Sequence, residues 1–327
     1  MFDADDLQAV WYAGRPPSLA QRALAAIYSC VVALRRTLYL CGVLRTERLP
    51  APVVVVGNIT VGGTGKTPLV IALVDALRAR GRKPGVVSRG YGGALGHPRL
   101  LDGASTAADC GDEPLLIHRM THAPVAVGRD RVAAARLLLA QGCDVVIADD
   151  GLQHYALARD IEICVLDGAR RFGNGRLLPA GPLREPVSRL SSVAFRVCNG
   201  GAQPGEVQMS LHGEVALPVA GGGSTIPLAQ FAGQRVHAVA GIGNPARFFT
   251  MLRDAGLVVD EHPFADHYAF AATDLDFGDG APVFMTQKDA VKCEAFASAN
   301  FWQVPVRAEL PEAFHDALAA RLTATTG

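Results

Sequence analysis

The sequence predicts an α/β protein: a larger domain built on a parallel sheet, a second and smaller α/β domain, and an amphipathic N-terminal helix at a membrane interface. Three observations support this prediction. From about residue 52 to 200, apolar strand-like runs alternate with helical patterns, which is typical of a parallel sheet covered by helices on both faces. After Asn199 a Gly-rich stretch is followed by a shorter set of β-loop-α units. Near the N-terminus, a helical pattern with widespread apolar positions begins after Ser18.

We therefore expect an interfacial helix region (1–50), a core domain (51–200), a β-ribbon or hinge linker (201–230) and a smaller domain (231–327). A chain of 327 residues is long enough for two compact domains. Lys plus Arg and Asp plus Glu both number 31, so the net charge gives no reason to expect nucleic acid as a partner. The seven cysteines contain no Cys-x-x-Cys pair, which favours reduced thiols in a cytosolic compartment.

The first element is a helix within about 18–45, preceded by an acidic start that lacks the features of a signal peptide. Only 12 residues separate Arg22 from Arg35, whereas a membrane span needs about 20. We therefore expect the helix not to cross a bilayer. It can lie in the membrane interface, with apolar side chains in lipid and arginines on anionic headgroups. From the residues alone, an ordinary core-packed helix is an equal alternative.

The strongest motif follows the apolar run Val53–Val56 and reads Thr60, Val61, Gly62, Gly63, Thr64, Gly65, Lys66, Thr67. Its glycines let successive N–H groups point at an anion, and the helix that follows offers its positive end. In such a loop the lysine reaches the β- and γ-phosphates, and the threonine hydroxyl ligates Mg²⁺. Thr60 stands where the usual pattern has a glycine, but the strand before and the helix after identify the context of a P-loop NTPase. We expect a nucleotide at 60–67 and Mg²⁺ at Thr67.

A loop of this type needs a carboxylate for the metal at the end of a nearby strand. Asp149 and Asp150 come directly after the apolar run Val145–Ala148. We expect one of them to ligate Mg²⁺ and the other to hold a water or a basic group, while a simple turn cap is the structural alternative.

Two short motifs have side chains suited to the group that receives the phosphate. The stretch "SRGYGG" places Arg89 on a flexible turn after a strand. Asp112 and Glu113 lie at a helix start, where a carboxylate can take a proton from a hydroxyl. Acidic residues also occupy this position simply to complement the helix dipole.

A long Gly- and Pro-rich loop between residues 168 and 189 carries five arginines against one acid. The five are Arg170, Arg171, Arg176, Arg184 and Arg189. Guanidinium groups bind phosphate in a bidentate manner, so the loop can form an anion cradle. A solvated basic loop is the alternative.

Taken together, these motifs are specific to one family. "VGNITVGGTGKTP", "SRGYGG", "GDEPLL", "DDGLQH", "LDGARRFGNGRLLPAGPLREP", "GIGNPARFF", "FADHYAF" and "TQKDAVK" occur in this order between about Leu19 and Lys292. The chain therefore resembles the tetraacyldisaccharide 4'-kinase (lipid A 4'-kinase) family. Its members transfer the γ-phosphate of ATP to the 4'-hydroxyl of a tetraacyldisaccharide 1-phosphate. The product is lipid IVA, made at the cytoplasmic face of the inner membrane of Gram-negative bacteria.

The resemblance implies roles for several residues. Asp112 would be the general base, His267 its partner from the second domain, and Lys66 the cation that stabilises the transferring phosphoryl group. One departure concerns Tyr268, where many members have a second histidine, so His267 is preferred, and His262 is a weaker candidate. The implied substrate-binding residues are Arg89, Glu113, Arg170, Arg171 and Arg176.

The resemblance also favours interfacial docking of the N-terminal helix over a core-packed one, because the substrate is a membrane lipid. The implied partners are this lipid and the inner membrane, where the protein would be peripheral; no obligate protein partner is implied. Two other functions stay open: a nucleotide-dependent switch, and a membrane module that binds nucleotide without turnover. A switch has no evident use for an arginine loop and a distant Asp-His pair.

Overall fold

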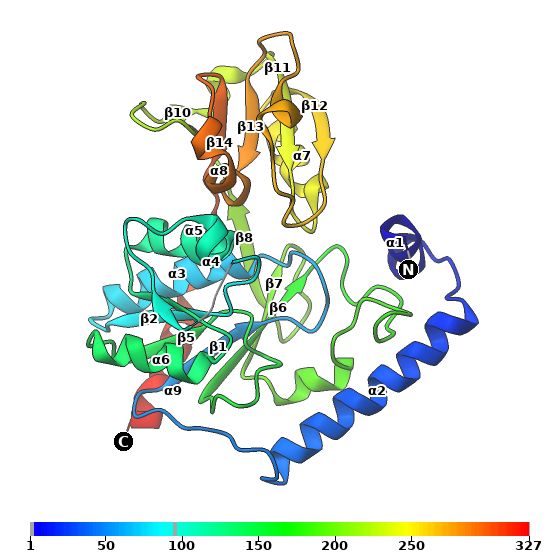
Figure 1. The fold of residues 1–327 in the computed structure, drawn as a ribbon, viewed down its shortest axis with the longest axis vertical. Coiled ribbons are helices and arrows are strands. Elements are labelled where there is room, and N and C mark those ends of the chain that lie inside the picture. The colour runs from blue at the N-terminus through cyan, green and yellow to red at the C-terminus, as the bar shows by residue number, and fades with distance from the viewer. Residues whose placement is uncertain (1–2, 94–96, 327) are drawn as a thin grey trace.

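The computed structural model describes residues 3–93 and 97–326 and contains two sheets flanked by helices (Figure 1). Within these residues the larger sheet has nine strands in the order β15-β8-β7-β6-β1-β5-β2-β4-β3, and the smaller has six in the order β10-β9-β14-β13-β11-β12. The larger sheet comprises β1 (Val53–Gly57), β2 (Pro84–Ser88), β3 (Arg99–Leu100), β4 (Val125–Val127), β5 (Val145–Ala148), β6 (Ile161–Asp167), β7 (Phe195–Asn199), β8 (Val207–His212) and β15 (Arg307–Glu309). The smaller comprises β9 (Val215–Pro218), β10 (Ile226–Pro227), β11 (Arg235–Ala240), β12 (Val258–Pro263), β13 (Val283–Thr286) and β14 (Phe301–Val304). The predicted α/β class is confirmed.

The larger sheet is parallel from β8 through β4, and its edge strands β3 and β15 are antiparallel to their neighbours. All five residues of β1 are buried. Helices cover both faces of the sheet, so a central strand has no side in water. This explains why Val53–Val56 reads as a continuous apolar run rather than an alternating one.

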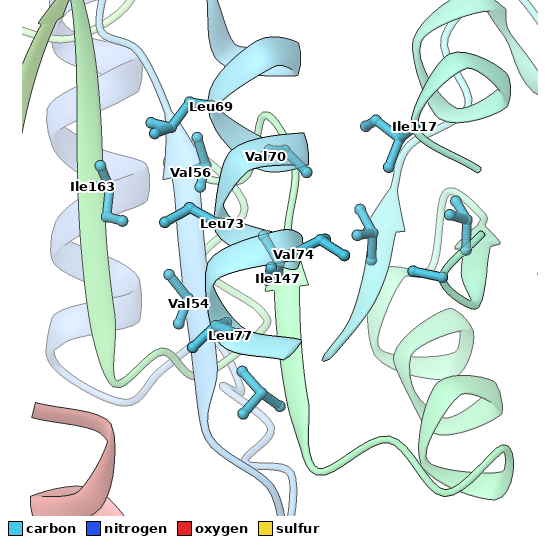
Figure 2. Packing of buried hydrophobic residues seen from close by; sticks show 14 of the residues in the cluster. Val54, Val56, Leu69, Val70, Leu73, Val74, Leu77, Ile117, Ile147 and Ile163 are labelled. Carbon is cyan, nitrogen blue, oxygen red and sulfur yellow. The ribbon is translucent and has the colours of Figure 1, made fainter. Parts of the chain in front are cut away.

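Helix α3 (Lys66–Ala79) fixes the position of the phosphate loop. Its buried side chains recur every three to four residues, which gives it one apolar stripe. The stripe comprises Leu69, Val70, Leu73, Val74 and Leu77. It packs against strands β1 and β5 and against Ile117 of α5 (Asp112–Thr121), as Figure 2 shows. On the opposite face of the sheet, Ala135 and Leu138 of α6 (Arg131–Ala140) belong to a second core cluster. The start of α3 is therefore held at the carboxyl end of β1.

A two-stranded ribbon connects the two sheets. β8 pairs with β15 in the larger sheet, and β9 pairs with β14 in the smaller one, both antiparallel. The pairing slips by one residue at the crossing, because His212 lies opposite Arg307 whereas Leu217 lies opposite Gln303. β8 and β9, which lie on either side of Gly213, therefore do not pair with each other as a hairpin. They carry the chain from the larger sheet into the smaller one, which suits the hinge expected within 201–230.

The carboxyl end of the chain lies on the larger sheet. β15 pairs with β8, and α9 (Glu312–Thr326) packs Phe314, Leu318 and Leu322 into the same core as α3. The observed smaller sheet ends at β14 and includes β9 and β10, so its limits differ from the expected range 231–327. A strand followed by a helix fits either sheet, and the sequence pattern therefore could not assign this segment.

Helix α2 (Leu19–Leu40) lies along the outside of the body, with α1 (Ala4–Tyr12) beyond its first turn (Figure 1). Ser18 caps α2: its hydroxyl accepts from the Gln21 amide at 3.2 Å, and its own amide donates to Gln21 Oε1 at 2.8 Å. Among the described residues, α2 is long and apolar enough to cross a membrane by length and composition, and none of that window is buried. Its interfacial placement stays a prediction.

The remaining helices complete the layers. α4 (Ala107–Cys110) precedes α5 on the larger sheet, and α7 (Pro245–Asp254) and α8 (Gln287–Cys293) belong to the smaller domain (Figure 1). α8 packs on α5 of the larger domain. The two domains therefore meet beside the start of α5, where the predicted base Asp112 lies.

Candidate active site

The predicted phosphate loop forms the turn from β1 into α3. Gly62 and Gly65 have φ angles of 99° and 95°, which only glycine adopts readily, and Gly65 is the N-cap of α3. A Cβ at Gly65 would also come within 2.6 Å of the Asn199 amide nitrogen. Lys66 Nζ lies 3.3 Å from Asn58 Oδ1 and 3.6 Å from Asp150 Oδ1. The loop thus presents backbone amides, a helix N-terminus and one ammonium to the same point.

The two adjacent aspartates after β5 have different surroundings. Asp149 is buried; Ser88 Oγ donates to its Oδ2 at 3.3 Å, and its Oδ1 has no hydrogen-bond partner among the described residues. Burial, with the nearby charges of Glu113 and Asp150, raises the pKa of Asp149 to about 7. An orphaned, desolvated carboxylate oxygen is an unusual feature that suits a cation ligand.

Asp150 is instead held by cations. Its φ is 45°, and Arg184 Nη1 donates to both of its carboxylate oxygens at 3.0 Å. Burial opposes ionisation of Asp150, but Lys66 and Arg184 outweigh it and hold the pKa well below the usual range. Asp150 therefore orients basic groups, and Asp149 is the carboxylate with a free oxygen.

We expect Asp149→Asn to stabilise the protein against unfolding, and to do so more at pH 8 than at pH 5. Because burial raises the pKa of Asp149 from 3.8 to about 7, the folded state binds a proton that the unfolded chain has lost. Stability therefore falls as the pH rises towards 7. Asparagine does not ionise, so the variant does not lose this stability as the pH rises. Thermal unfolding without nucleotide or metal at both pH values checks the result.

Asp150→Asn is the matched control for this experiment. The pKa of Asp150 is lowered by its cations, so its charge stabilises the fold at any pH above the unfolded value. Its removal should lower Tm at both pH 5 and pH 8. A gain from Asp149→Asn that is equal at the two pH values would contradict the proposed burial effect.

The predicted pair Asp112 and His267 lies together across the two domains. His267 Nδ1 is 3.1 Å and 3.2 Å from the two carboxylate oxygens of Asp112. Asp112 is the first residue of α5, and its Oδ1 also accepts from the Glu113 amide at 2.9 Å. The hydrogen bond to Asp112 raises the pKa of His267. Burial opposes ionisation of Asp112, yet His267 and Lys288 outweigh it and lower the pKa of Asp112.

Lys288 is a site residue that the sequence reasoning did not single out. It lies on α8 of the smaller domain, and its Nζ is 3.0 Å from Glu113 Oε1, 2.9 Å from Asp266 Oδ1 and 3.5 Å from His267 Nε2. Burial of the ammonium is offset by these carboxylates, which raise the pKa of Lys288. Its motif "TQKDAVK" was a signal of the family, but no role was attached to the lysine.

Two cavities meet at the phosphate loop. The smaller, about 190 Å³, has largely apolar walls from both domains, including Ile71, Ile242, Phe248 and Met251. The larger, about 810 Å³, opens onto Asp112 and His267. Some residues line both cavities; they are Gly63, Lys66 and Glu113. A phosphoryl group held by the loop would therefore lie between a nucleotide-sized recess and an open acceptor space.

Arginines line much of the larger cavity, but only some were predicted to do so. Arg89 and Arg184 are among its lining residues, as expected for the turn and the loop that carry them. Residues that the sequence reasoning missed here are Arg35, Tyr91, Arg129, Arg131, Gln153 and His154. The ring of Tyr91 lies 5.0 Å from that of His267. An acidic or phosphorylated acceptor would meet these arginines, although carboxylates that include Asp112, Glu113 and Asp266 line the same cavity.

The structure does not bring Arg170, Arg171 and Arg176 to either cavity, in contrast to the expected substrate-binding set. Arg171 makes a bidentate pair with Glu206 at 2.7 Å and 2.9 Å, and Arg170 donates to the carbonyl of Gly243. Arg176 is exposed. The charge count within the loop could not predict the pairing of Arg170 and Arg171, because their partners Gly243 and Glu206 lie outside the loop.

The weaker histidine candidate lies elsewhere in the smaller domain. His262 Nε2 is 3.0 Å from His237 Nδ1, and its ring stacks on Phe277. Tyr268, in the place of the second family histidine, packs against Phe264 and Phe270. Neither side chain is among the residues that line the two cavities.

Comparisons with known proteins show which family the chain is similar to. A family model described as "LpxK: Tetraacyldisaccharide-1-P 4'-kinase" matches residues 18–323. A tetraacyldisaccharide 4'-kinase from Stenotrophomonas maltophilia is 56% identical over 323 residues, with 95% of each chain covered. One from Xanthomonas euvesicatoria pv. vesicatoria is 53% identical over 326 residues, covering 95% of this chain and 94% of the relative.

A solved structure is also similar over most of the chain. It is the crystal structure of an "apo" form LpxK from Aquifex aeolicus in complex with ATP at 2.2 Å resolution. It has a TM-score of 0.75 and 28% sequence identity, and covers 92% of this chain and 98% of that one. The chain belongs to the tetraacyldisaccharide-1-P 4'-kinase family.

Proposed function

We propose that this member of the family transfers the γ-phosphoryl group of ATP to the 4'-hydroxyl of tetraacyldisaccharide 1-phosphate, giving lipid IVA, with Asp112 as the general base. One observation carries the assignment of roles: the phosphate loop and the Asp112–His267 pair face the same cavity. The names of the relatives and the ATP complex of the similar crystal structure support the two substrates.

ATP would occupy the smaller cavity and the phosphate loop. The base would lie among the apolar side chains of Ile242, Phe248 and Met251, and the phosphates on the amides of 62–67. Lys66, which Asn58 and Asp150 hold in place, would stabilise charge on the transferring oxygens. Transfer then depends mainly on positioning and electrostatics.

Asp112 would orient the attacking hydroxyl and accept its proton. Its lowered pKa keeps the carboxylate ionised at neutral pH. With a hydrogen on Nδ1, His267 donates to Asp112 and leaves further lone pairs of the carboxylate for the hydroxyl. Because His267 comes from the smaller domain and Asp112 from the larger, the pair is complete only when the two domains are together.

The donor groups at this site fit Mg²⁺. The described residues contain no cluster of three or more His, Cys, Asp and Glu side chains suited to a metal. Mg²⁺ at nucleotide sites uses one or two carboxylates with phosphate oxygens and waters, so such a cluster is not required. Asp149, with its unpartnered oxygen, and Thr67 would hold the ion, and Asp150 would hold Lys66. When bound, Mg²⁺ neutralises charge on the phosphates.

The lipid acceptor would enter the larger cavity from the side of α2. Tyr28, Val31 and Val32 of α2 line this cavity. Arg89 and Arg129 are exposed arginines of the same lining and are suited to the anionic 1-phosphate. Glu113 would hold Lys288 of the smaller domain at the boundary between the acceptor and the nucleotide.

The chain would act as a peripheral protein on the cytoplasmic face of the inner membrane. The inner face of α2 contacts the body, since Tyr28 donates to the carbonyl of Arg184 at 3.1 Å and the ring of Tyr39 lies 5.7 Å from that of Tyr155. The outer face is apolar and exposed; its large members are Leu24, Ile27 and Leu34. An exposed apolar stripe flanked by arginines is suited to an anionic lipid surface.

We expect the double substitution Ile27→Glu and Leu34→Glu to lower partition onto vesicles of anionic phospholipid by about tenfold or more. Both side chains are 61% exposed, and burying each in the lipid boundary contributes about 1.5 kcal/mol or more. A co-sedimentation assay measures the change. Val258→Glu, at an exposed apolar site of the smaller domain, is the matched control. Equal partition of the double variant and wild type would remove the membrane role from this face.

One experiment tests the proposed function as a whole. Incubation with γ-labelled ATP and tetraacyldisaccharide 1-phosphate should move the label into the lipid. A nucleotide switch would instead release labelled phosphate when a protein partner is added, and a non-catalytic membrane module would release none. Label that stays in ATP under all conditions, or appears only as free phosphate, would contradict the kinase assignment.

A further inference from the structure

The turn 241–244, between β11 and α7, contacts the phosphate loop directly. A Cβ on Gly243 would overlap the amide nitrogen of Gly63, and a Cβ on Gly63 would lie 3.3 Å from the nitrogen of Gly243. The backbones of the two domains therefore touch at the point where the triphosphate is proposed to bind. A contact this close persists only if other interactions fix the position of one domain relative to the other.

The carboxylate of Asp167 is placed to do so. It ends β6 of the larger sheet, and its side chain is 5% exposed. Its Oδ1 accepts from the amides of Ala169 and Arg170 at 2.9 Å and 3.0 Å, which shapes its own turn. The other contacts cross to the smaller domain: Arg247 Nη2 lies 3.1 Å from Oδ1, and Asn244 Nδ2 donates to Oδ2 at 3.3 Å.

Neighbouring contacts join the same two elements. Arg170, whose amide belongs to the Asp167 turn, donates from its side chain to the carbonyl of Gly243. The Asp167 turn therefore contacts the turn 241–244 through a second residue. Arg247 Nη2 lies 3.5 Å from the carbonyl oxygen of Asn199, the register neighbour of Asp167 on β7. Asn199 Nδ2 in turn donates to the carbonyl of Thr64 in the phosphate loop at 3.2 Å. The contact at Asp167 is thus mechanically linked to that loop.

We propose that Asp167 is a positioning residue for nucleotide binding, which latches Asn244 and Arg247 of the smaller domain over the phosphate loop. This inference rests on the proposed function, because it assigns ATP to the smaller cavity, which Gly63, Asn244 and Arg247 line. A latched turn forms one wall of the cavity before ATP arrives, so binding does not have to order that wall. Without the carboxylate, the guanidinium and amide lose their common acceptor.

The test is direct ATP binding by the full chain in the absence of acceptor, measured by titration calorimetry. We expect Asp167→Asn and Arg247→Gln each to raise Kd for ATP by about tenfold, a size that one charge-assisted hydrogen bond can provide. The double variant should be little weaker than either single one, because both remove the charge pairing between residues 167 and 247. Arg176→Ala, an exposed arginine of the neighbouring loop, should bind like wild type.

A second readout separates the latch from a merely structural role. Amide hydrogen exchange of residues 241–247 should speed up in Asp167→Asn, while Tm stays near that of wild type, because asparagine still accepts from the amides of its own turn. If wild type does not bind ATP, the proposed function fails together with the latch. If wild type binds and Asp167→Asn binds equally well, or if the two substitutions are additive, only the latch is overturned. Should Asp167→Asn fail to fold, hydrogen exchange of residues 241–247 in Arg247→Gln tests the latch, because Arg247 also lines the ATP cavity and its Kd alone does not separate the two roles.

Discussion

Asp112→Asn is expected to lower kcat for lipid phosphorylation by about 10²- to 10⁴-fold, the range for loss of general-base work. The substitution keeps the size of the side chain and its place at the start of α5. It removes the charge that His267 hydrogen-bonds at 3.1 Å and that Lys288 and Lys292 approach at 4.0 Å. KM for ATP should change little, because Asp112 lines the larger cavity and not the smaller one, where ATP is proposed to bind.

Steady-state kinetics with a saturating acceptor measure this change. Asp109→Asn is the matched control, since Asp109 lies three residues upstream, is half-buried, and hydrogen-bonds Thr106 at a helix cap. It should retain activity near that of wild type. Near-normal transfer by Asp112→Asn would remove the base from this position while leaving the family and the fold as they are.

The sequence was informative wherever the relevant signal is local. The run Val53–Val56, the loop 60–67 and the apolar stripe of α3 are contiguous, so the strand, turn and helix were predicted in place. Asp149 and Asp150 follow β5 directly, but their difference could not be predicted. Burial raises the pKa of Asp149, whereas Lys66 and the distant Arg184 lower that of Asp150.

Contacts between distant segments were accessible only through the family resemblance. Asp112 and His267 are 155 residues apart in sequence, and no periodicity connects them. Lys288 was missed for the same reason, because its partners Glu113 and Asp266 become visible only when the domains are assembled. The arginine loop shows the converse error: its composition indicates free positive charge, whereas Glu206 and the carbonyl of Gly243 bind Arg171 and Arg170.

The crossing of the chain between domains was also invisible in the pattern. "FWQVPVRAEL" reads as one strand-like segment, yet β14 belongs to the smaller sheet and β15 to the larger. Pairing partners decide this division: β14 pairs with β9, and β15 with β8. A single sequence carries no information on such partners, since any half-buried strand satisfies the same alternation.

Lys66→Ala should lower kcat by about 10²- to 10³-fold, the loss typical of removing one preorganised donor to developing charge. The ammonium is largely buried, with 10% of the side chain exposed, and is fixed by Asn58 and Asp150. In the proposed role it would reach the transferring oxygens without reorganisation, which alanine cannot imitate. Lys83→Ala, at an exposed lysine before β2, is the control for general loss of positive charge and should keep full activity.

The split between kcat and nucleotide affinity makes this prediction specific. Backbone amides of 62–67 and the helix N-terminus still bind phosphate in Lys66→Ala, so Kd for ATP should rise far less than kcat falls. Asp150 keeps its pair with Arg184 at 3.0 Å, and the site should stay folded. A variant that binds ATP much more weakly but turns over at the normal rate once saturated would mean that Lys66 anchors the ground state and contributes nothing to transfer.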